Sequence, residues 1–599
     1  MTLQIATVLL LMGAAVTLMT LDIFRADFVA LALAVVLTLV GVVTPQEAFS
    51  GFASTAAVTI MAVFILTSGL YRTGITRQVG RELQKMAGAE PRRLLVLTML
   101  VGGGLSLFMN NVAATALLMP AVMDISRRTK VSPSKLMMPL AFSVNLGGAA
   151  TLLATSNILV SSTLTKLGLR PFGFLEFAPL GLPMLGVGVV YVLLVGRHLL
   201  PVHGLAAQFG RSQMRGDLSK TYALEARMTE LRVPDGSALV GKPVGESDVG
   251  REYGLSILAV CRADGAVCTA PQADLVLEPD DVLVVTGRFE RAQALADTGA
   301  VVLEPRTHEN GLENGQIALI EAIVAPRSNA VGHSLQDLRF RETYGLSVVA
   351  LWRDGRPYRT DVGRMTLRFG DGLLVHGPRE RITLLQRNPD YLVLTESDEP
   401  LRTERAWVAG VIMIVALVVA ALDWLPLAVS MMAGALLMVA LGCLDMDMAY
   451  RSIEWRAIFL IAGMLPCGIA MSSSGTADWL SRVIIDTLGR YPPVVLSTGV
   501  LLLAMLLTQV MSGQVTAVVL TPIAVAAATQ LGITPHSLAM AVAMGCSMVF
   551  ITPTAHPANV LVMGPGGYRF SDFARVGAPL TILTVLTVVI LLPIFFPLT

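Results

Sequence analysis

Hydrophobic residues fall into long runs separated by short polar segments. Ten runs are long enough to cross a hydrocarbon layer about 30 Å thick as helices. They lie at 3–21, 27–43, 55–72, 136–165, 177–199, 405–422, 426–443, 456–472, 537–563 and 577–597. Two more apolar stretches, 94–123 and 494–529, are interrupted in the middle by polar residues. We expect both to be re-entrant hairpins, because backbone groups at a polar tip need partners inside protein or in a water-filled site.

The two apolar halves of the chain repeat each other. At a constant offset of 402 residues, Pro120 aligns with Pro522 and Asn157 aligns with Asn559. Each half contains five predicted spans, an odd number, so the second half enters the membrane with the opposite orientation. The pattern therefore predicts a mainly α polytopic transporter made of two inverted repeats, each with five spans and a hairpin.

Loop charges predict the orientation of these spans. If residues 22–26 are cytosolic, most basic loop residues of both halves fall on the cytosolic side, as the positive-inside rule requires. We therefore expect a multi-pass protein of the cell inner membrane, with both termini outside and residues 203–403 in the cytosol. The composition agrees, because 54% of the residues are hydrophobic and 15% are charged. A net charge of +1 argues against a nucleic-acid partner, which would need a concentrated basic face.

The polar segment between the halves contains a second repeat. Residues 251–260 resemble 342–351, and 279–287 resemble 369–377. Short β-branched runs with Asp-Gly and Pro-Asp-Asp turns predict two small strand-rich modules in tandem, an α+β insert. We expect four parts: a first membrane repeat at 1–202, cytosolic domains at 203–303 and 304–403, and a second membrane repeat at 404–599.

The hairpin tips are the first candidate binding residues. Asn110 and Asn111 lie in the middle of an apolar stretch, and Ser512, Gly513 and Gln514 occupy the matching position in the second half. Amides buried in a membrane are costly unless they bind something. A helix that begins at such a break presents free N–H groups to an anion, and carbonyl groups at the break can hold a cation. The alternative is that these residues only join packed helices.

Breaks in the helices that follow the hairpins are the second candidates. The first is Ala154-Thr155-Ser156-Asn157, and the second runs from Pro553 through His556 and Pro557 to Asn559. Prolines on both sides of His556 forbid a continuous helix, which frees carbonyl groups for a cation or a substrate. His556 could donate a hydrogen bond to an oxyanion or carry a coupling proton. It could equally be a neutral histidine held by the local break.

The sequence also excludes some classes of function. It contains no nucleophile and base pair, no His/Cys/Asp cluster and few carboxylates within the spans. An enzyme is disfavoured, and so is a carrier of cations, which would need buried negative charge. No cofactor is expected apart from a coupling ion.

At these residues the chain resembles the divalent-anion/sodium symporter family (DASS, solute carrier 13-like), over both membrane halves. The resemblance implies that tips and breaks together hold sodium and an oxyanion, in a homodimer surrounded by membrane lipid. It implies substrate contacts from Asn110, Asn111, Thr155, Ser512, Gln514, His556 and Pro557. It implies sodium ligands at Asn110, Asn111, Ala154, Asn157, Gly513, Ala555 and Asn559. The chain departs from the family pattern at Val112, which replaces a hydroxyl, at Gly513, which replaces an asparagine, and in a first break that is one residue short.

The insert resembles two tandem C-terminal domains of potassium-conductance regulators (RCK_C domains). Symporters with such an insert are similar to sulfate transporters, so the resemblance favours sulfate or a similar inorganic oxyanion. It leaves open whether the insert binds a nucleotide or an ion as a regulator, or only supports dimerisation. Two alternatives for the whole protein remain: a sodium- or proton-coupled carrier of dicarboxylates or tricarboxylates, and an anion channel or sensor.

Overall fold

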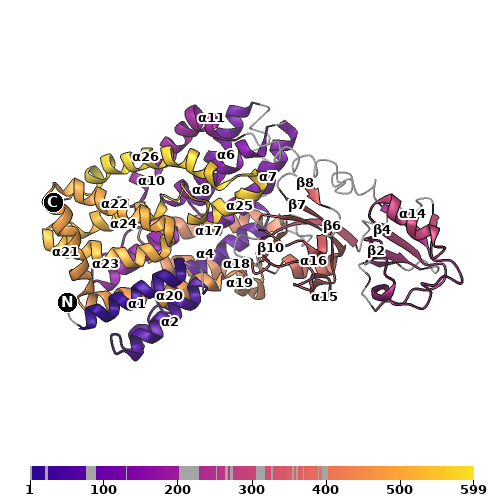
Figure 1. The fold of residues 1–599 in the computed structure, drawn as a ribbon. Helices are drawn as coiled ribbons and strands as arrows, with labels where there is room; N and C mark the ends of the chain where they lie inside the picture. The colour runs from indigo at the N-terminus through magenta and orange to yellow at the C-terminus, as the bar shows by residue number, and fades with distance from the viewer. Residues whose placement is uncertain are drawn as a thin grey trace. The chain divides into compact units, whose positions relative to one another are not determined.

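The computed structural model divides the chain into two compact units, Met1–His203 with Pro400–Thr599 and Gly204–Glu399. Figure 1 shows the first as packed helices and the second as two small sheets with short helices. The residues that the structure describes are 3–20, 24–75, 90–129, 131–201, 228–250, 252–262, 267–269, 271, 274–304, 317–324, 328–353, 356–358, 362–368, 370–386, 388, 390–393 and 403–598.

Within the described residues, the helical unit contains two matching series of helices, which differ in that the first has no described counterpart of α21. The first series is α1 (Leu3–Thr20), α2 (Ala26–Leu39), α3 (Pro45–Phe49), α4 (Thr55–Arg72), α6 (Pro91–Ser106), α7 (Asn111–Thr129), α8 (Met137–Gly148), α9 (Thr155–Lys166) and α10 (Ala178–Tyr191), followed by a π-helical turn (Val192–Gly196) and α11 (Arg197–Leu199). The second is α17 (Ala406–Ala421), α18 (Leu427–Ala440), α19 (Met446–Ser452), α20 (Trp455–Ser473), α21 (Thr476–Leu488), α22 (Pro493–Val510), α23 (Gly513–Leu531), α24 (Pro535–Ser547), α25 (Pro557–Gly566) and α26 (Phe570–Phe595). The repeat predicted from the sequence is therefore present in the fold.

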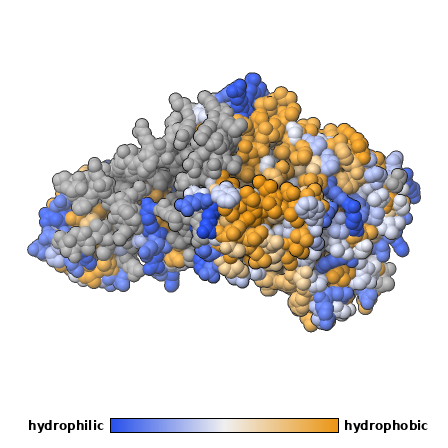
Figure 2. All heavy atoms as spheres, turned by 180° about the vertical axis from the view of Figure 1, so that it is seen from behind, coloured by the Kyte–Doolittle hydropathy of each residue, from blue (hydrophilic) through white to orange (hydrophobic). Residues whose placement is uncertain are grey.

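Apolar side chains cover much of this unit's surface, as the orange areas of Figure 2 show. Along α26, Ile582, Leu586, Ile590 and Ile594 are all more than half exposed at a spacing of four residues. Such a stripe has no favourable place in water and fits a lipid-facing helix. Among the described residues, seven helices are long and apolar enough to cross a membrane. They include both α22 and α23, which together contain the predicted hairpin at 494–529. By length alone, this stretch could therefore cross the membrane twice or form the hairpin.

The two series interlock symmetrically. Helix α2 packs against α20, and the corresponding pair α18 and α4 also pack together. Helix α8 packs against α25, and α24 against α9. Both of these contacts between the series thus occur again with the roles exchanged, which is expected when two repeats are related by a two-fold axis.

Close contact between backbones holds α6 against α8. A Cβ atom added to Gly147 would lie 2.1 Å from the carbonyl oxygen of Gly103, so only glycine fits there. Gly103 belongs to the Gly102-Gly103-Gly104 run of α6. These glycines therefore serve helix packing in a membrane helix and do not form a nucleotide-binding loop.

The second unit contains two antiparallel sheets with five strands each. The first has the order β3-β2-β4-β1-β5 and the second the order β10-β6-β9-β7-β8, which is the same topology when read in reverse. Within each sheet the strand pairs are antiparallel. The first sheet contains β1 (Met228–Arg232), β2 (Ser256–Cys261), β3 (Val267–Thr269), β4 (Val282–Thr286) and β5 (Val302–Glu304), with helix α14 (Phe289–Asp297). The second contains β6 (Ile317–Val324), β7 (Ser347–Arg353), β8 (Arg356–Tyr358), β9 (Gly372–Pro378) and β10 (Tyr391–Val393), with helices α15 (Phe340–Tyr344) and α16 (Arg379–Gln386).

Candidate ion and anion binding site

The first hairpin tip is a short turn between α6 and α7. The Oδ1 atom of Asn110 accepts a hydrogen bond from the backbone N–H of Val112 at 2.8 Å, which satisfies one free donor in the first turn of α7. Asn111 begins the helix, and its carboxamide lies directly over Gly148, where an added Cβ would be 2.3 Å from Asn111 Oδ1. Both asparagines are half-buried. The tip therefore lies against the C-terminal end of α8.

The second tip follows the same plan with different side chains. Ser512 precedes α23 and its hydroxyl is 3.5 Å from the backbone nitrogen of Val515. Gly513 replaces Asn111 and approaches α24 so closely that an added Cβ would be 2.8 Å from the Cys546 carbonyl oxygen. Gln514 is half-buried in the first turn of α23. Each tip thus contacts the end of the helix that precedes the break in its own repeat.

Each break is held by one fully buried asparagine. Asn157, in the first turn of α9, donates from Nδ2 to the Thr151 carbonyl oxygen at 2.8 Å and to that of Ala149 at 3.4 Å. Asn559, in the first turn of α25, donates from Nδ2 to the carbonyl oxygens of Val549 at 2.6 Å and Thr552 at 3.4 Å. The carbonyl groups that accept from Asn157 lie six and eight residues before it in the chain. Those that accept from Asn559 lie seven and ten residues before it. The first break is therefore the shorter one.

Three asparagines form a hydrogen-bonded chain between the repeats. Asn111 Nδ2 donates to Asn145 Oδ1 at 3.2 Å, and Asn145 Nδ2 donates to Asn559 Oδ1 at 3.1 Å. At the other end, the Ser106 hydroxyl donates to Asn111 Oδ1 at 2.7 Å. Asn145 lies in α8 and is 2% exposed. This chain joins the first tip to the second break.

Three more hydrogen bonds connect tips and breaks. The Thr151 hydroxyl donates to the Leu107 carbonyl oxygen at 3.3 Å, which joins the first break to the first tip. In the second repeat, Gln509 donates from Nε2 to the Met548 carbonyl oxygen at 2.9 Å and accepts from the Thr552 hydroxyl at 3.2 Å. Helix α23, which begins at the second tip, also packs against α9, which begins at the first break. The four interrupted segments thus form one connected region.

The remaining predicted residues lie at the starts of the two helices after the breaks. Ala154 and Thr155 are half-buried, at the position before α9 and at its first residue. The buried Ala555 ends a short 3₁₀ turn, Pro557 is the exposed first residue of α25, and His556 lies between them. His556 Nδ1 accepts a hydrogen bond from the Ala558 N–H at 3.1 Å, so a neutral ring carries its proton on Nε2. His556 thus caps α25 and keeps one donor available.

The sequence reasoning missed Asn145, Ser106, Gln509 and Thr552, because their roles depend on how the helices pack. The signal for Asn145 was a lone amide in an apolar helix, at a position where the second repeat has Ser547.

The centre of this region carries no full charge in its sequence. Segments 104–115, 145–160, 508–518 and 545–562 contain no Asp, Glu, Lys or Arg. Helices α7, α9, α23 and α25 all begin there and bring their positive dipole ends to the region, which favours an anion. One N–H group each of α7, α23 and α25 is already bound by Asn110, Ser512 and His556. Helices α6, α8, α22 and α24 end there and supply carbonyl oxygens. Such a neutral site can take an anion together with a cation.

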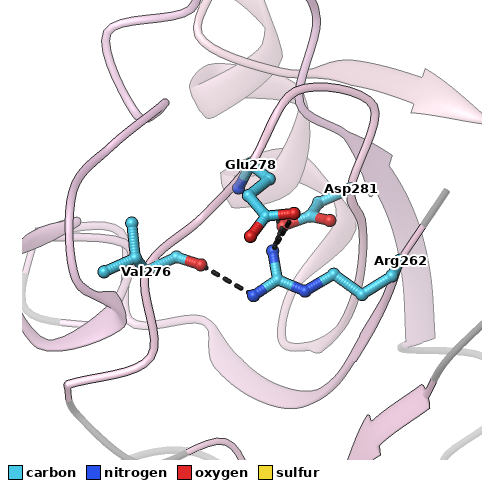
Figure 3. Close-up of polar contacts among 4 residues, drawn as sticks. All are labelled: Arg262, Val276, Glu278 and Asp281. Carbon is cyan, nitrogen blue, oxygen red and sulfur yellow. Dashed lines mark hydrogen bonds and ion pairs between the residues drawn. The ribbon is translucent and has the colours of Figure 1, made fainter. Parts of the chain in front are cut away.

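Each sheet domain of the insert contains an ion pair between a half-buried arginine and a buried aspartate. Figure 3 shows the first, in which Arg262 Nη1 lies 2.7 Å from Asp281 Oδ2 and Arg262 Nη2 donates to the Val276 carbonyl oxygen at 2.9 Å. In the second, Arg353 contacts both oxygens of Asp371, at 2.5 and 2.8 Å, and donates to the Thr366 carbonyl oxygen. Burial raises the pKa of Asp281, although the Glu278 N–H and Arg262 act in the opposite direction. The Arg262–Asp281 pair connects the end of β2 to the turn before β4. The Arg353–Asp371 pair connects the end of β7 to the turn before β9 in the same way.

Comparison with known proteins agrees with this architecture. Residues 8–545 match the model of the CitMHS family, described as citrate transporter. The chain is 36% identical to Uncharacterized transporter sll0640 of Synechocystis, over 99% of this chain and 97% of that one. It is 32% identical to Uncharacterized transporter YfbS of Escherichia coli, over 99% of both chains. It is also 26% identical to Sodium/sulfate cotransporter 2 of Chlamydomonas reinhardtii, over 59% of this chain and 41% of that one.

These matches establish the class of the protein. The chain is a multi-pass membrane transporter that belongs to the CitMHS family. Its relatives include sodium/sulfate cotransporters and Solute carrier family 13 member 2 of Oryctolagus cuniculus, so the resemblance found in the sequence is confirmed. A crystal structure of the GsuK RCK domain aligns with 27% of this chain and 63% of its own, at 15% identity and a TM-score of 0.13. The likeness of the insert to RCK_C domains stays a prediction.

Proposed function

We propose that this transporter is a sodium-coupled symporter of sulfate or a similar inorganic oxyanion. The observation that carries the proposal is the uncharged region where four helices begin and four end. An oxyanion there would be bound by helix N-termini, by amides at the tips and by His556 Nε2, with no lysine or arginine to neutralise it. A cation bound at the neighbouring carbonyls would then offset its charge. The Chlamydomonas relatives, which are named as sodium/sulfate cotransporters, support sodium and sulfate as the pair.

Uptake into proteoliposomes tests the coupling. We expect labelled sulfate to accumulate when sodium is present outside at a higher concentration than inside, and to equilibrate without accumulation when potassium replaces sodium. Equal accumulation with and without a sodium gradient would contradict the proposal. Accumulation driven by a proton gradient alone would support the proton-coupled alternative.

The description of the matched family favours a second candidate, a carrier of citrate or another di- or tricarboxylate. Competition separates the two. Citrate and succinate should block sulfate uptake only if the site admits a carbon backbone, whereas molybdate should block it in either case. Conductance far above a carrier's turnover would instead indicate a channel.

We further propose that residues 203–403 form a cytosolic regulatory insert, that both termini lie outside and that the protein is a homodimer. The loop charges support the orientation. Regulation can be tested on the full-length protein, with nucleotides and divalent cations added to the side that carries the insert. A ligand that changes the sulfate uptake rate and also raises the thermal stability would identify the regulator. If none of the added ligands changes the uptake rate or the thermal stability, the insert would instead have a constitutive role in dimerisation.

A further inference from the structure

A small cavity lies between the ends of α9 and α20, two helices that pack against each other. Its volume is about 150 Å³. The polar part of its lining consists of Thr163 and Lys166 from α9 and of Ser472 and Ser473 from α20. Thr163 is buried, whereas the lysine and both serines are exposed and can be reached by a dissolved ion. No carboxylate lines the cavity.

Lys166 brings the only full charge of this lining. It makes no ion pair or hydrogen bond with another residue that the structure describes. At the offset of 402, its counterpart in the second repeat is Tyr568. The Tyr568 hydroxyl is buried, accepts from the Met138 N–H at 2.8 Å and donates to the Ser134 carbonyl oxygen. The repeat architecture therefore does not require a charge at this position.

The two serine hydroxyls beside the lysine are held by long hydrogen bonds. Ser472 donates to the Gly468 carbonyl oxygen at 3.2 Å, and Ser473 donates to that of Ala470 at 3.4 Å. Both distances exceed the usual range of hydroxyl hydrogen bonds. The Ala470 carbonyl oxygen also accepts from the Ser474 hydroxyl, at 2.6 Å, so it keeps a partner when Ser473 turns away. An ammonium group with two hydroxyls that can turn is a suitable set of donors for an oxyanion.

The cavity and the candidate site lie at opposite ends of one helix. Helix α9 begins at Thr155, in the first break, and ends at Lys166, about 16 Å further along its axis. The candidate membrane span Ala178–Leu199 follows Lys166 in the chain, so Lys166 and Leu199 lie on opposite faces of the membrane. In the proposed orientation, Lys166 is therefore on the outer face.

We propose that this cavity is an outer binding site for the oxyanion that the transporter carries. Lys166 pairs with one oxygen of the anion, and Ser472 and Ser473 donate to others. Water reaches the ammonium group, so the pairing is weak enough to release the anion toward the start of α9. The uncharged central region thereby gains an attractive charge on the entry side. The identity of the ligand rests on the proposed function.

Acylation of lysines in the purified full-length protein, in nanodiscs of neutral lipid, tests the site. Only the neutral amine reacts, and a bound anion stabilises the ammonium form. We expect potassium sulfate to slow the acylation of Lys166 roughly threefold or more, as measured by peptide mass spectrometry. The exposed Lys242 of the insert is the internal reference and should react at an unchanged rate. Potassium chloride of equal ionic strength should protect neither lysine. Equal rates for Lys166 in sulfate and in chloride would overturn the proposal.

Two further measurements separate this cavity from the central region and from lipid. In His556→Ala, the sulfate concentration that gives half protection of Lys166 should equal that of the wild type. An increase in parallel with the KM for uptake would show that the protection comes from the central region, against the proposal. Protection by anionic phospholipid in the nanodiscs, but not by sulfate, would identify a lipid headgroup site and also contradict it.

Uptake into proteoliposomes tests the consequence for transport. At low ionic strength and sulfate concentrations far below KM, Lys166→Gln should lower the uptake rate about threefold and leave the maximal rate unchanged. Lys166→Arg keeps the charge and should behave as the wild type. Arg490→Gln is the matched control, because Arg490 is exposed on the same face and does not line the cavity.

A lysine that only stabilises the C-terminal end of α9 would give another pattern. Lys166→Gln would then lower the thermal stability and leave uptake below KM unchanged, and the proposal would be wrong. A wild-type protein that takes up no sulfate would refute the proposed function itself. The acylation rates would still decide whether the cavity binds an oxyanion.

Discussion

At the scale of single residues, the second tip shows how a binding group can be held in a strained backbone. Ser512 has φ 153° and ψ 152°, a region that is occupied almost only by glycine. Such a conformation costs about 1–3 kcal/mol in a residue with a side chain. The next residue, Gly513, is held against the Cys546 carbonyl, so the neighbouring contacts keep Ser512 in this state. We suggest that serine is present here for its hydroxyl group.

Ser512→Gly should therefore stabilise the fold and weaken the site. We expect a gain of about 1 kcal/mol from the relieved strain, because the weak cap to Val515 contributes only a few tenths. The loss of the hydroxyl should raise the KM for sulfate by roughly tenfold. Thermal unfolding in detergent and uptake kinetics measure the two effects. Ser512→Ala is the control, since it keeps the strain and loses the hydroxyl, and it should raise KM without stabilising the protein.

His556 can be separated into a capping role and a binding role. Asparagine can supply an acceptor to the Ala558 N–H in place of Nδ1, but it has no donor at the position of Nε2. His556→Asn should keep the thermal stability and raise the KM for sulfate, whereas His556→Ala should also lose about 1 kcal/mol of stability. An unchanged KM in His556→Asn would leave the histidine with the capping role alone. Protonation of Nδ1 would break this cap, which argues against His556 as a proton carrier.

The sequence predicted those site residues that occur at matching positions in the two repeats. It did not predict residues whose role depends on how the helices pack. Asn111, Asn157 and Asn559 stand out because they are polar, buried in apolar runs and matched between the halves. Asn145 has no matching amide, and its partners lie 34 residues before and 414 residues after it. No local sequence pattern predicts contacts between residues so far apart in the chain.

At the scale of elements, the contact between α6 and α8 fixes the first tip relative to the first break. Gly147 and Gly103 bring the two backbones together, near the ends of the helices that lead to Asn111 and Asn157. Any side chain at this crossing would separate the helices and shift the tip away from the break.

Gly147→Ala should destabilise the protein by several kcal/mol, because the new methyl group would overlap a backbone carbonyl that cannot move aside easily. Gly104→Ala, one residue beyond the contact, is the matched control. A Cβ atom at Gly104 meets nothing within 4 Å, and alanine is the better helix former by about 1 kcal/mol. Thermal unfolding of the two variants should move in opposite directions. Equal effects would show that the α6–α8 contact is less tight than described.

The pattern of apolar runs predicted most long helices but not all elements. Helix α4 is found at the predicted residues 55–72, and α26 begins at Phe570, before the predicted 577, because Asp572 accepts from the Arg569 N–H and starts the helix early. Helix α21 was not predicted, since its 13 residues are amphipathic and do not form a continuous apolar run. In the insert, the turns and β-branched runs indicated strands, whereas their order in the sheets became visible only in the structure.

At the scale of the whole molecule, one chain contains two internal repeats, one in each unit. Both repeats are imperfect at their polar contacts. In the insert, Arg353 makes two bonds to Asp371, whereas Arg262 reaches only one oxygen of Asp281. The Asp281 Oδ1 atom is buried with no hydrogen-bond partner among the described residues.

Loss of Arg353 should therefore weaken the insert more than loss of Arg262. Arg353→Ala leaves a buried carboxylate without its partner, which costs roughly 3 kcal/mol in such pairs. Hydrogen exchange of the full-length protein should show faster exchange in β7 and β9 for Arg353→Ala, and a smaller change in β2 and β4 for Arg262→Ala. The exchange of α8 and α24 serves as an internal reference. A larger effect from Arg262→Ala would contradict the difference in bonding.

The absence of charged side chains at the centre has an electrical consequence. Since the sequence places no Asp, Glu, Lys or Arg in the four interrupted segments, these segments add no full charge of their own when the loaded or empty site changes sides. The charge that these segments help to move in one transport cycle is then the charge of the bound anion plus the charges of the bound sodium ions. One sodium with divalent sulfate would carry net negative charge inward, against a potential worth about 2.3 kcal/mol per charge for each 100 mV. With a monovalent anion the same cycle would be electrically silent.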